Sequence, residues 1–236
     1  KDWSYELLAA AQWMMCKDPA GNGYAAKGGN NDENHNHNDI GHFLCVYEGE
    51  MLLTDLGAGE YTRDYFSDGR YGILCNRSLG HSVPLLNGQE QCAGKEYAAD
   101  AFCWDEKDKT LTISFGGGYP DGCIHKIQRS IRAWDEDVQL HLCVEDSFEV
   151  SKQTRTITEN LVTQYLPIVE GNVIQIQGNR AKMEITVEGA DGDIQILSES
   201  HSNHNGQQEP VYLVQWDVKL QGKDTVCNMS ICCSPR

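Results

Sequence analysis

From about residue 42 onward, hydrophobic and polar residues alternate in short runs that end at Gly, Asn or Asp. Alternation with a period of two predicts strands with one buried face, and the bounding residues are typical of turns. We predict about a dozen short strands of this kind, at residues 42–47, 51–54, 83–86, 97–104, 110–115, 124–133, 138–144, 156–165, 173–177, 182–187, 194–197, 211–218 and 225–232. The spacing favours an all-β fold, a large antiparallel β-sandwich.

The first residues follow a different pattern. Residues 3–15 are rich in helix formers and apolar on most faces, and Pro19 and Gly21 would end a helix. We therefore expect a short N-terminal helix as a connector within residues 1–20, followed by one β-sandwich domain over residues 21–236. Because an isolated helix of this length is marginally stable, it needs a sheet or a preceding domain to pack against.

Composition and charge argue against some classes of partner. A formal net charge of −16 argues against a nucleic-acid partner, which a clustered basic surface would bind. An acidic polymer is not excluded, because a metal and a few Arg can form a local cationic pocket. No apolar run is long enough to span a bilayer, so no membrane partner is expected. The ten Cys include no CxxC pair, which favours reduced thiols and a cytoplasmic location, with periplasmic or secreted locations left open.

Candidate chemistry is concentrated in residues 28–41, which are rich in Asn, His and carboxylates. If residues 34–39 are extended, His35, His37 and Asp39 share one face. Two neutral imidazoles at this spacing can bind a divalent metal, or one can ligate while the other handles a proton. The plain alternative is a loop with hydrogen-bonded histidines.

Two residues further along the chain could complete a metal site. Asp55 follows an apolar strand and precedes glycines, where it could also serve only as a turn former. With His37 and His81 it would supply two nitrogens and one oxygen, a set that suits zinc better than magnesium or calcium. Strand histidines such as His42 and His141 are expected to be structural, and we do not expect a second metal site at His201 and His204.

An ordered series of motifs resembles the heparinase II/III-type polysaccharide lyases. The matching stretches are residues 28–30, 35–43, 53–62, 70–71, 81–91, 118–120, 128–132 and 142–146. Together they cover most of residues 24–148. The resemblance implies a C-terminal antiparallel β-sandwich that normally follows an α-helical toroid, with the active site in the cleft between them. We expect the toroid to be absent from this chain and the N-terminal helix to be its remnant.

The resemblance also implies roles for individual residues. His35 would take part in catalysis, and His37, Asp55 and His81 would hold the zinc found in some members. The reaction would be β-elimination at a uronic acid unit of an acidic polysaccharide, with a catalytic Tyr supplied by the toroid. We further expect Asn36, Tyr61 and Arg70 to contact the substrate. Ser82 departs from the family pattern, which usually has Asn after the His.

Two other functions compete with the lyase hypothesis. A carbohydrate-binding or docking module without catalysis would fit the β-sandwich, but binding alone does not require the His, Asp and His set. A cupin-type metal enzyme also uses His-x-His on a β-scaffold. That pattern needs a Glu a few residues after the second His, where this chain has Gly41 and His42.

Overall fold

The structure is a computed structural model that describes residues 2–236, and it confirms the all-β prediction. Its strands form four sheets, and every strand pairing within them is antiparallel. Helical structure in the described residues is limited to short 3₁₀ turns. No helix within residues 2–236 has the length and apolar character needed to cross a membrane.

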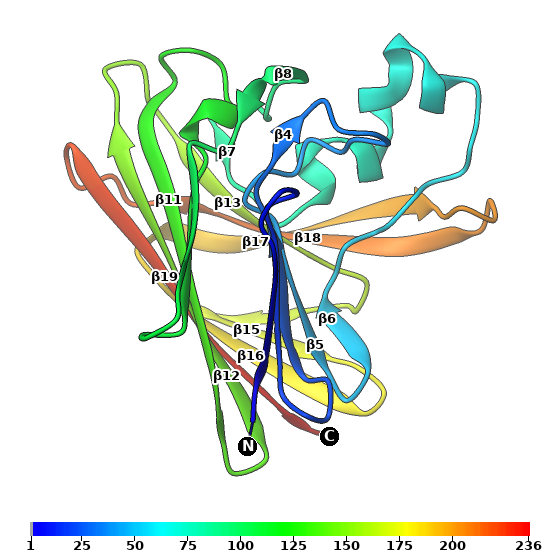
Figure 1. Cartoon of the computed structure of the whole chain (residues 1–236), viewed down its shortest axis with the longest axis vertical. Coiled ribbons are helices and arrows are strands. Elements are labelled where there is room, and N and C mark those ends of the chain that lie inside the picture. Colours follow the sequence, from blue (N-terminus) through cyan, green and yellow to red (C-terminus); the bar gives the residue numbers. More distant parts are fainter. Residues whose placement is uncertain (1) are drawn as a thin grey trace.

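Two sheets make up the sandwich (Figure 1). The five-stranded sheet has the order β1 (Ser4–Leu8), β2 (Trp13–Lys17), β3 (Gly23–Lys27), β5 (Phe43–Tyr47) and β6 (Glu50–Leu53). The eight-stranded sheet has the order β14 (Ile168–Glu170), β15 (Val173–Gln177), β16 (Ala181–Glu188), β19 (Asp224–Pro235), β12 (Gln139–Val150), β11 (Ile124–Glu136), β10 (Thr110–Ser114) and β9 (Ala101–Asp105).

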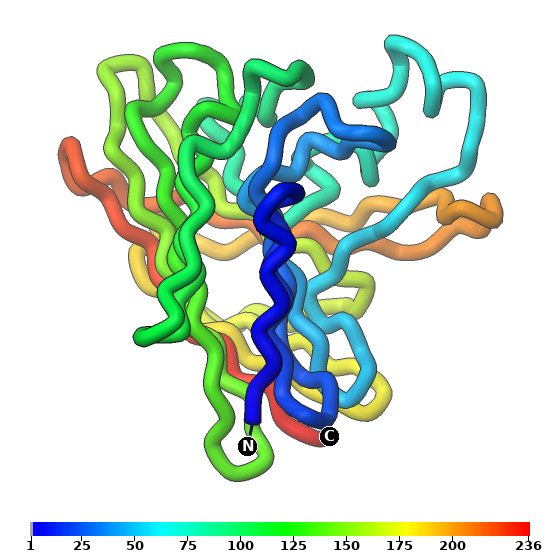
Figure 2. Tube along the Cα trace, viewed as in Figure 1, coloured from blue at the N-terminus to red at the C-terminus, as the bar shows by residue number. Residues whose placement is uncertain are grey.

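Two smaller sheets and the 3₁₀ turns complete the fold. The four-stranded sheet has the order β17 (Ala190–Ser202), β18 (Gln208–Val218), β13 (Ile157–Thr163) and β7 (Leu85–Leu86), and β4 (Asn30–Asn31) pairs with β8 (Gly94–Ala98). The 3₁₀ turns are η1 (Asp64–Phe66), η2 (Asp68–Gly72), η3 (Leu74–Asn76), η4 (Ser78–Gly80) and η5 (Gly116–Gly118). In Figure 2 the turns of residues 64–80 lie at the upper right, above the β17–β18 hairpin.

The main core lies between the two large sheets. Phe43 of β5 and Leu52 of β6 are buried in one cluster with Ile131 of β11 and Leu142 of β12. On β12 the buried positions alternate with partly or fully exposed ones, as the sequence pattern predicted for a half-buried strand. A second cluster packs η1 and η3 against β13 and β18, through Leu56, Tyr65, Cys75, Val162, Val211 and Leu213.

The predicted N-terminal helix is wrong. Residues 4–17 form the β1–β2 hairpin, and β2 continues the sheet by pairing with β3. The three consecutive Ala lie in the hairpin turn, where their helix propensity has no effect. Met14 and Cys16 alternate with the exposed Met15 and are buried in the main core. Sheet pairing and burial therefore override a local preference that is worth only tenths of a kcal/mol per residue, roughly.

Smaller differences also follow from turns. The predicted strand at residues 97–104 is two strands, β8 and β9, with Ala99 and Asp100 between them. Ala99 N–H donates to Gly29 O at 2.8 Å and Asp100 N–H to Ser114 O at 2.7 Å, so this short break is hydrogen-bonded to other segments. The break brings β8 alongside β4, at the start of the His-rich loop.

Candidate metal and catalytic site

Residues 28–41 form one loop, the His loop, whose two ends meet between β3 and β5. Lys27 N–H donates to His42 O at 3.0 Å, and Gly41 N–H donates to Lys27 O at 2.8 Å. The buried Lys27 ammonium donates to Asp39 at 2.6 Å and lies 3.4 Å from Glu33. Burial opposes the charge, but the two carboxylates outweigh it and raise the pKa of Lys27. An ion pair inside the loop thus holds its conformation.

The expectation of an extended segment at residues 34–39 is wrong. His35 adopts a left-handed conformation with φ of 56°, and Asn36 N–H donates back to Glu33 O at 3.1 Å. His35 is exposed, whereas Asp39 is buried against Lys27, so the two do not share a face with His37. Asn and Asp side chains bond to nearby backbone and favour turns over a sheet ladder.

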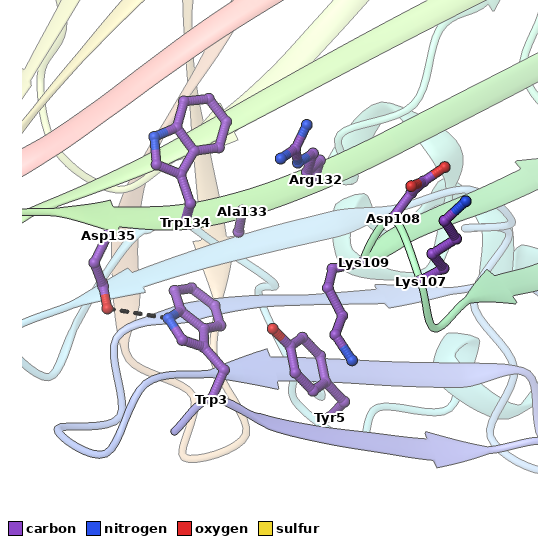
Figure 3. Close-up of a pocket in the computed structure, with 9 residues that line it drawn as sticks. All are labelled: Trp3, Tyr5, Lys107, Asp108, Lys109, Arg132, Ala133, Trp134 and Asp135. Carbon is purple, nitrogen blue, oxygen red and sulfur yellow. Dashed lines mark hydrogen bonds between the residues drawn. The ribbon is translucent and has the colours of Figure 1, made fainter. Parts of the chain in front are cut away.

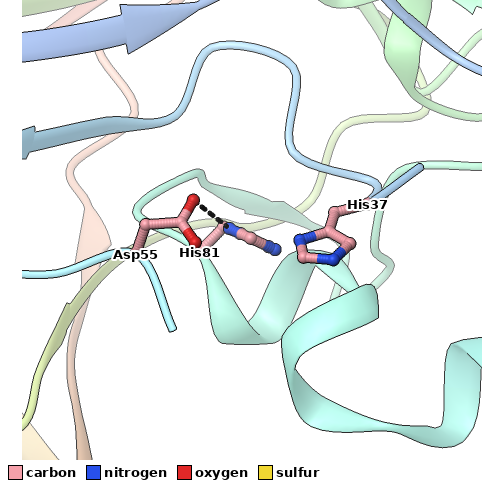
Figure 4. Close-up of side chains that lie close together, drawn as sticks. All are labelled: His37, Asp55 and His81. Atoms are coloured by element: carbon pink, nitrogen blue, oxygen red, sulfur yellow. Dashed lines mark ion pairs between the residues drawn. The ribbon is translucent and has the colours of Figure 1, made fainter. Parts of the chain in front are cut away.

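The structure brings His37, Asp55 and His81 together (Figure 4). One nitrogen or oxygen from each side chain lies within 4.8 Å of the others. His37 comes from the His loop, Asp55 follows β6, and His81 follows η4. The convergence predicted from the sequence is therefore confirmed as geometry, and the identity of any metal stays a prediction.

The placement of hydrogens on these three side chains decides which of their atoms could bind a metal. His81 Nε2 must carry its hydrogen, because it bonds to the carbonyl oxygen of Cys75 at 2.9 Å and a carbonyl can only accept. Burial, with His81 nearby, lowers the pKa of His37 to about 4, so this ring is neutral at pH 7. Burial opposes ionisation of Asp55, but the imidazoles of His81 and His42 and the Gly57 N–H lower its pKa to about 2.

A bound cation would explain why His81 and Asp55 lie close together. His81 Nδ1 is buried with no hydrogen-bond partner among the described residues, and it lies 3.9 Å from Asp55 Oδ2. When its Nε2 alone carries a hydrogen, His81 Nδ1 is an acceptor like the carboxylate oxygen, and an unpaired buried acceptor is costly. Two imidazole nitrogens and one carboxylate oxygen are a donor set for a divalent transition metal. The residues present therefore fit a metal ion.

A buried arginine links the two chain segments next to the ligands. Arg129 of β11 makes a bidentate pair with Asp146 of β12, at 2.8 and 2.5 Å. Its Nη1 donates to Gly41 O at 2.8 Å and to Ser82 O at 2.6 Å. Burial and Asp146 raise the pKa of the neighbouring Glu159, which is consistent with a neutral carboxyl there. Arg129 thus fastens the end of the His loop and the residue after His81 to the main sheet.

The remaining predicted site residues lie around His35. The Tyr61 ring is 48% exposed and lies parallel to the His35 ring at 6.5 Å between centroids. Asn36 is buried, and its amide donates to Asn38 at 3.1 Å and to the Tyr71 hydroxyl at 3.4 Å. The Arg70 guanidinium donates to the backbone oxygens of Asn36 and Tyr65. The polar groups of Asn36 and Arg70 therefore brace the His loop.

The candidate site opens into a hollow of about 430 Å³ that is lined by His35, His37, Asp55 and Tyr61. A separate hollow of about 540 Å³ lies between β1 and β11 and has Trp3, Tyr5, Lys109 and Trp134 among its lining residues. Figure 3 shows Trp3 hydrogen-bonded to Asp135 below the β11 ribbon and Trp134 above it in this view. Of the two hollows, the first contains the histidines and Asp55 of the candidate site.

Two histidines that the sequence did not assign to the site also lie beside it. His42 is buried with its Nε2 3.5 Å from Asp55 Oδ2. His204, in the β17–β18 loop, packs edge-on against Tyr61 at 4.7 Å between ring centroids. His201 and His204 are not in the group of possible metal ligands found among residues 2–236. Only the pairing of distant segments brings these rings to the site.

Comparison with known proteins places this architecture in a family. The heparinase II/III-like, C-terminal family pattern matches residues 2–222. No curated protein matches the sequence. Among solved structures, a heparinase III has a TM-score of 0.76 at 14% identity, and the heparan sulfate lyase HepC from Pedobacter heparinus has 0.71 at 16%. All of this chain is covered in both, but only 36% and 37% of those chains. At such identities the structural likeness shows the fold, and the family match shows that the chain belongs to the heparinase II/III-like, C-terminal family.

Proposed function

We propose that the chain is the C-terminal domain of a polysaccharide lyase that cleaves a uronic-acid-containing polysaccharide by β-elimination. The observation that carries the proposal is the exposed His35, held at a hollow beside the His37, Asp55 and His81 group. Family membership supports it. The chain spans just over a third of the two solved structures, and we propose that activity belongs to a longer protein that also contains a toroid domain. The domain alone should be weakly active or inactive.

The reaction defines what His35 would do. A base removes the proton on the carbon next to the uronate carboxylate, and the 4-linked oxygen then leaves with a proton. That carbon acid is very weak while the carboxylate is ionised, so the site must neutralise the carboxylate. His35 would carry a proton or donate a hydrogen bond to the carboxylate, and a Tyr of the toroid would complete the acid–base pair.

Residues around His35 would orient the sugar. Tyr61 offers an exposed ring beside His35, and aromatic faces pack well on the apolar faces of sugar rings. Asn36 and Arg70 remain predicted substrate contacts, although their polar groups are already bonded within the protein. Because of these bonds, the two residues would act on the substrate through the shape of the His loop.

We propose that the metal is zinc, held by His37, Asp55 and His81. Bound there, zinc would supply a fixed positive charge that could also polarise an acid oxygen. We favour an organising role, because the three ligands come from three separate segments and His37 is two residues from His35. His37 and His81 would offer neutral nitrogens, and Asp55 its ionised oxygen.

The lyase proposal is tested with the full-length protein on a panel of uronate polymers that begins with heparan sulfate. Cleavage should generate the ultraviolet absorbance of an unsaturated uronate. His35→Ala should suppress this signal without changing the circular dichroism spectrum, whereas His125→Ala, at an exposed His on β11, should leave it unchanged. Full activity of His35→Ala on a cleaved polymer would refute the role of His35.

The metal proposal has its own measurement. The purified domain should contain close to one equivalent of zinc, and His37→Ala should lose it. A domain that is free of metal and fully stable would refute the zinc site.

A further inference from the structure

His42 is buried between the two segments that carry His81 and Asp55. It begins the return of the His loop into β5 and is 2% exposed. Its Nδ1 accepts the Ser82 N–H at 2.9 Å, and its Nε2 lies 3.5 Å from Asp55 Oδ2. Its ring lies edge-on to the His81 ring, with 5.0 Å between centroids. One side chain therefore contacts both neighbouring ligand segments.

The hydrogen bond from Ser82 determines the tautomer of His42. A backbone N–H can only donate, so Nδ1 must hold a lone pair and the ring hydrogen must be on Nε2. Apart from Asp55, this Nε2–H faces no acceptor: it has no hydrogen-bond partner within 3.5 Å that meets normal geometry in the described residues. The donor thus lies next to the carboxylate, at 3.5 Å, without forming a hydrogen bond to it.

One oxygen of the Asp55 carboxylate accepts a hydrogen bond, and the other faces the two histidines. Its Oδ1 accepts the Gly57 N–H at 2.7 Å, while Oδ2 faces the Nε2–H of His42 and the bare Nδ1 of His81. His42 does not belong to the cluster of three ligand atoms that lie within 4.8 Å of one another. Its position suits a donor that orients a ligand, since second-layer hydrogen bonds of this kind commonly set metal affinity.

We propose that His42 is a positioning residue for the metal site, which orients Asp55 through Nε2–H and fixes the residue after His81 through Nδ1. This inference rests on the proposed metal site. It assigns to His42 no contact with metal or substrate. It also gives a reason for an imidazole at this buried position, because Nδ1 accepts a hydrogen bond from the Ser82 segment while Nε2–H lies next to Asp55 on another segment.

Two substitutions separate the Ser82 hydrogen bond from the contact with Asp55. In His42→Asn the amide oxygen can replace Nδ1 and keep the Ser82 bond, but the donor to Asp55 is lost. In His42→Gln the amide nitrogen can replace Nε2 as a donor to Asp55. We expect zinc affinity, measured by competition with a chelator, to fall about 10- to 100-fold in His42→Asn and to recover in part in His42→Gln. His141→Asn, at a strand His stacked on Trp134, should leave affinity unchanged.

A spectroscopic readout distinguishes positioning from a general loss of fold. The cobalt(II) form of His42→Asn should show an altered absorption spectrum, while thermal unfolding of its metal-free form stays near that of the unsubstituted domain. Unchanged zinc affinity and cobalt spectrum in His42→Asn would overturn the proposal. If no form of the domain binds zinc or cobalt, the proposed metal site is refuted. The tautomer of His42 can still be tested by nitrogen-15 chemical shifts.

The tautomer can be measured without any substitution. Nitrogen-15 chemical shifts of His42 in the unsubstituted domain should show hydrogen on Nε2 and a bare Nδ1, with and without zinc. Hydrogen on Nδ1, or a shift of Nε2 to a metal-bound value on adding zinc, would overturn the assignment. Because it uses the unsubstituted domain, this measurement tests the assigned tautomer of His42 even if His42→Asn fails to fold.

Discussion

Gly41→Ala would test whether the end of the His loop depends on close packing against the core. Gly41 has φ of 88°, and a Cβ built there would lie 2.7 Å from Phe115 Cζ and 2.8 Å from two further ring carbons. The Phe115 ring is fully buried, and the Arg129 guanidinium lies over it with 5.8 Å to the ring centroid. The new methyl therefore adds a steric clash to an unfavourable backbone conformation.

The two costs can be estimated separately. A left-handed conformation costs a residue with a Cβ about 1–2 kcal/mol, and forcing a methyl into a packed core costs about 1–3 kcal/mol. Gly41→Ala should thus lower the free energy of unfolding by about 2–5 kcal/mol, or roughly 4–20 °C in Tm for a chain of this size. Urea denaturation followed by circular dichroism would measure it.

The matched control is Gly192→Ala. Gly192 of β17 has φ of 83°, but a Cβ there meets nothing within 4 Å. It should cost only the backbone term of about 1–2 kcal/mol. If both variants lose the same free energy, the approach of Gly41 to Phe115 contributes nothing and the packing argument is refuted.

Two further predictions concern buried charges. Glu50 accepts three backbone N–H bonds from residues 179–181; burial opposes its ionisation, yet these bonds lower its pKa to about 2. Glu50→Gln should therefore cost about 2 kcal/mol at pH 7, and the difference should shrink as pH falls from about 4.5 to 2; a pH-independent difference would contradict this. Arg129→Gln would leave Asp146 without its buried partner and should cost about 3–5 kcal/mol, against about 0.5 or less for the exposed Arg132→Gln, both by thermal unfolding.

Local sequence pattern was sufficient for most strands of the large sheet, although it missed β14 and merged β9 with β8. In β12 the alternation of buried and outward positions is visible in the residues themselves, because a strand between a core and solvent must place apolar side chains on one face. The types of the three candidate ligands were also readable, since imidazole and carboxylate chemistry does not depend on the fold. The prediction of an N-terminal helix was wrong. It relied on a run of Ala, and helix propensity is a weak local signal.

The conformation of the His loop and the partners of its histidines were decided only by the tertiary structure. The loop is shaped by Lys27 and by bonds to Arg129, which lies 88 residues beyond Gly41 in sequence. His42 has the same alternating context as a structural strand residue, and only the approach of Asp55 and Ser82 distinguishes it. Sequence therefore determined which chemical groups are present and which strands carry them. Folding determined which groups meet, because contacts between distant segments depend on sheet pairing and core packing, and no local pattern encodes these.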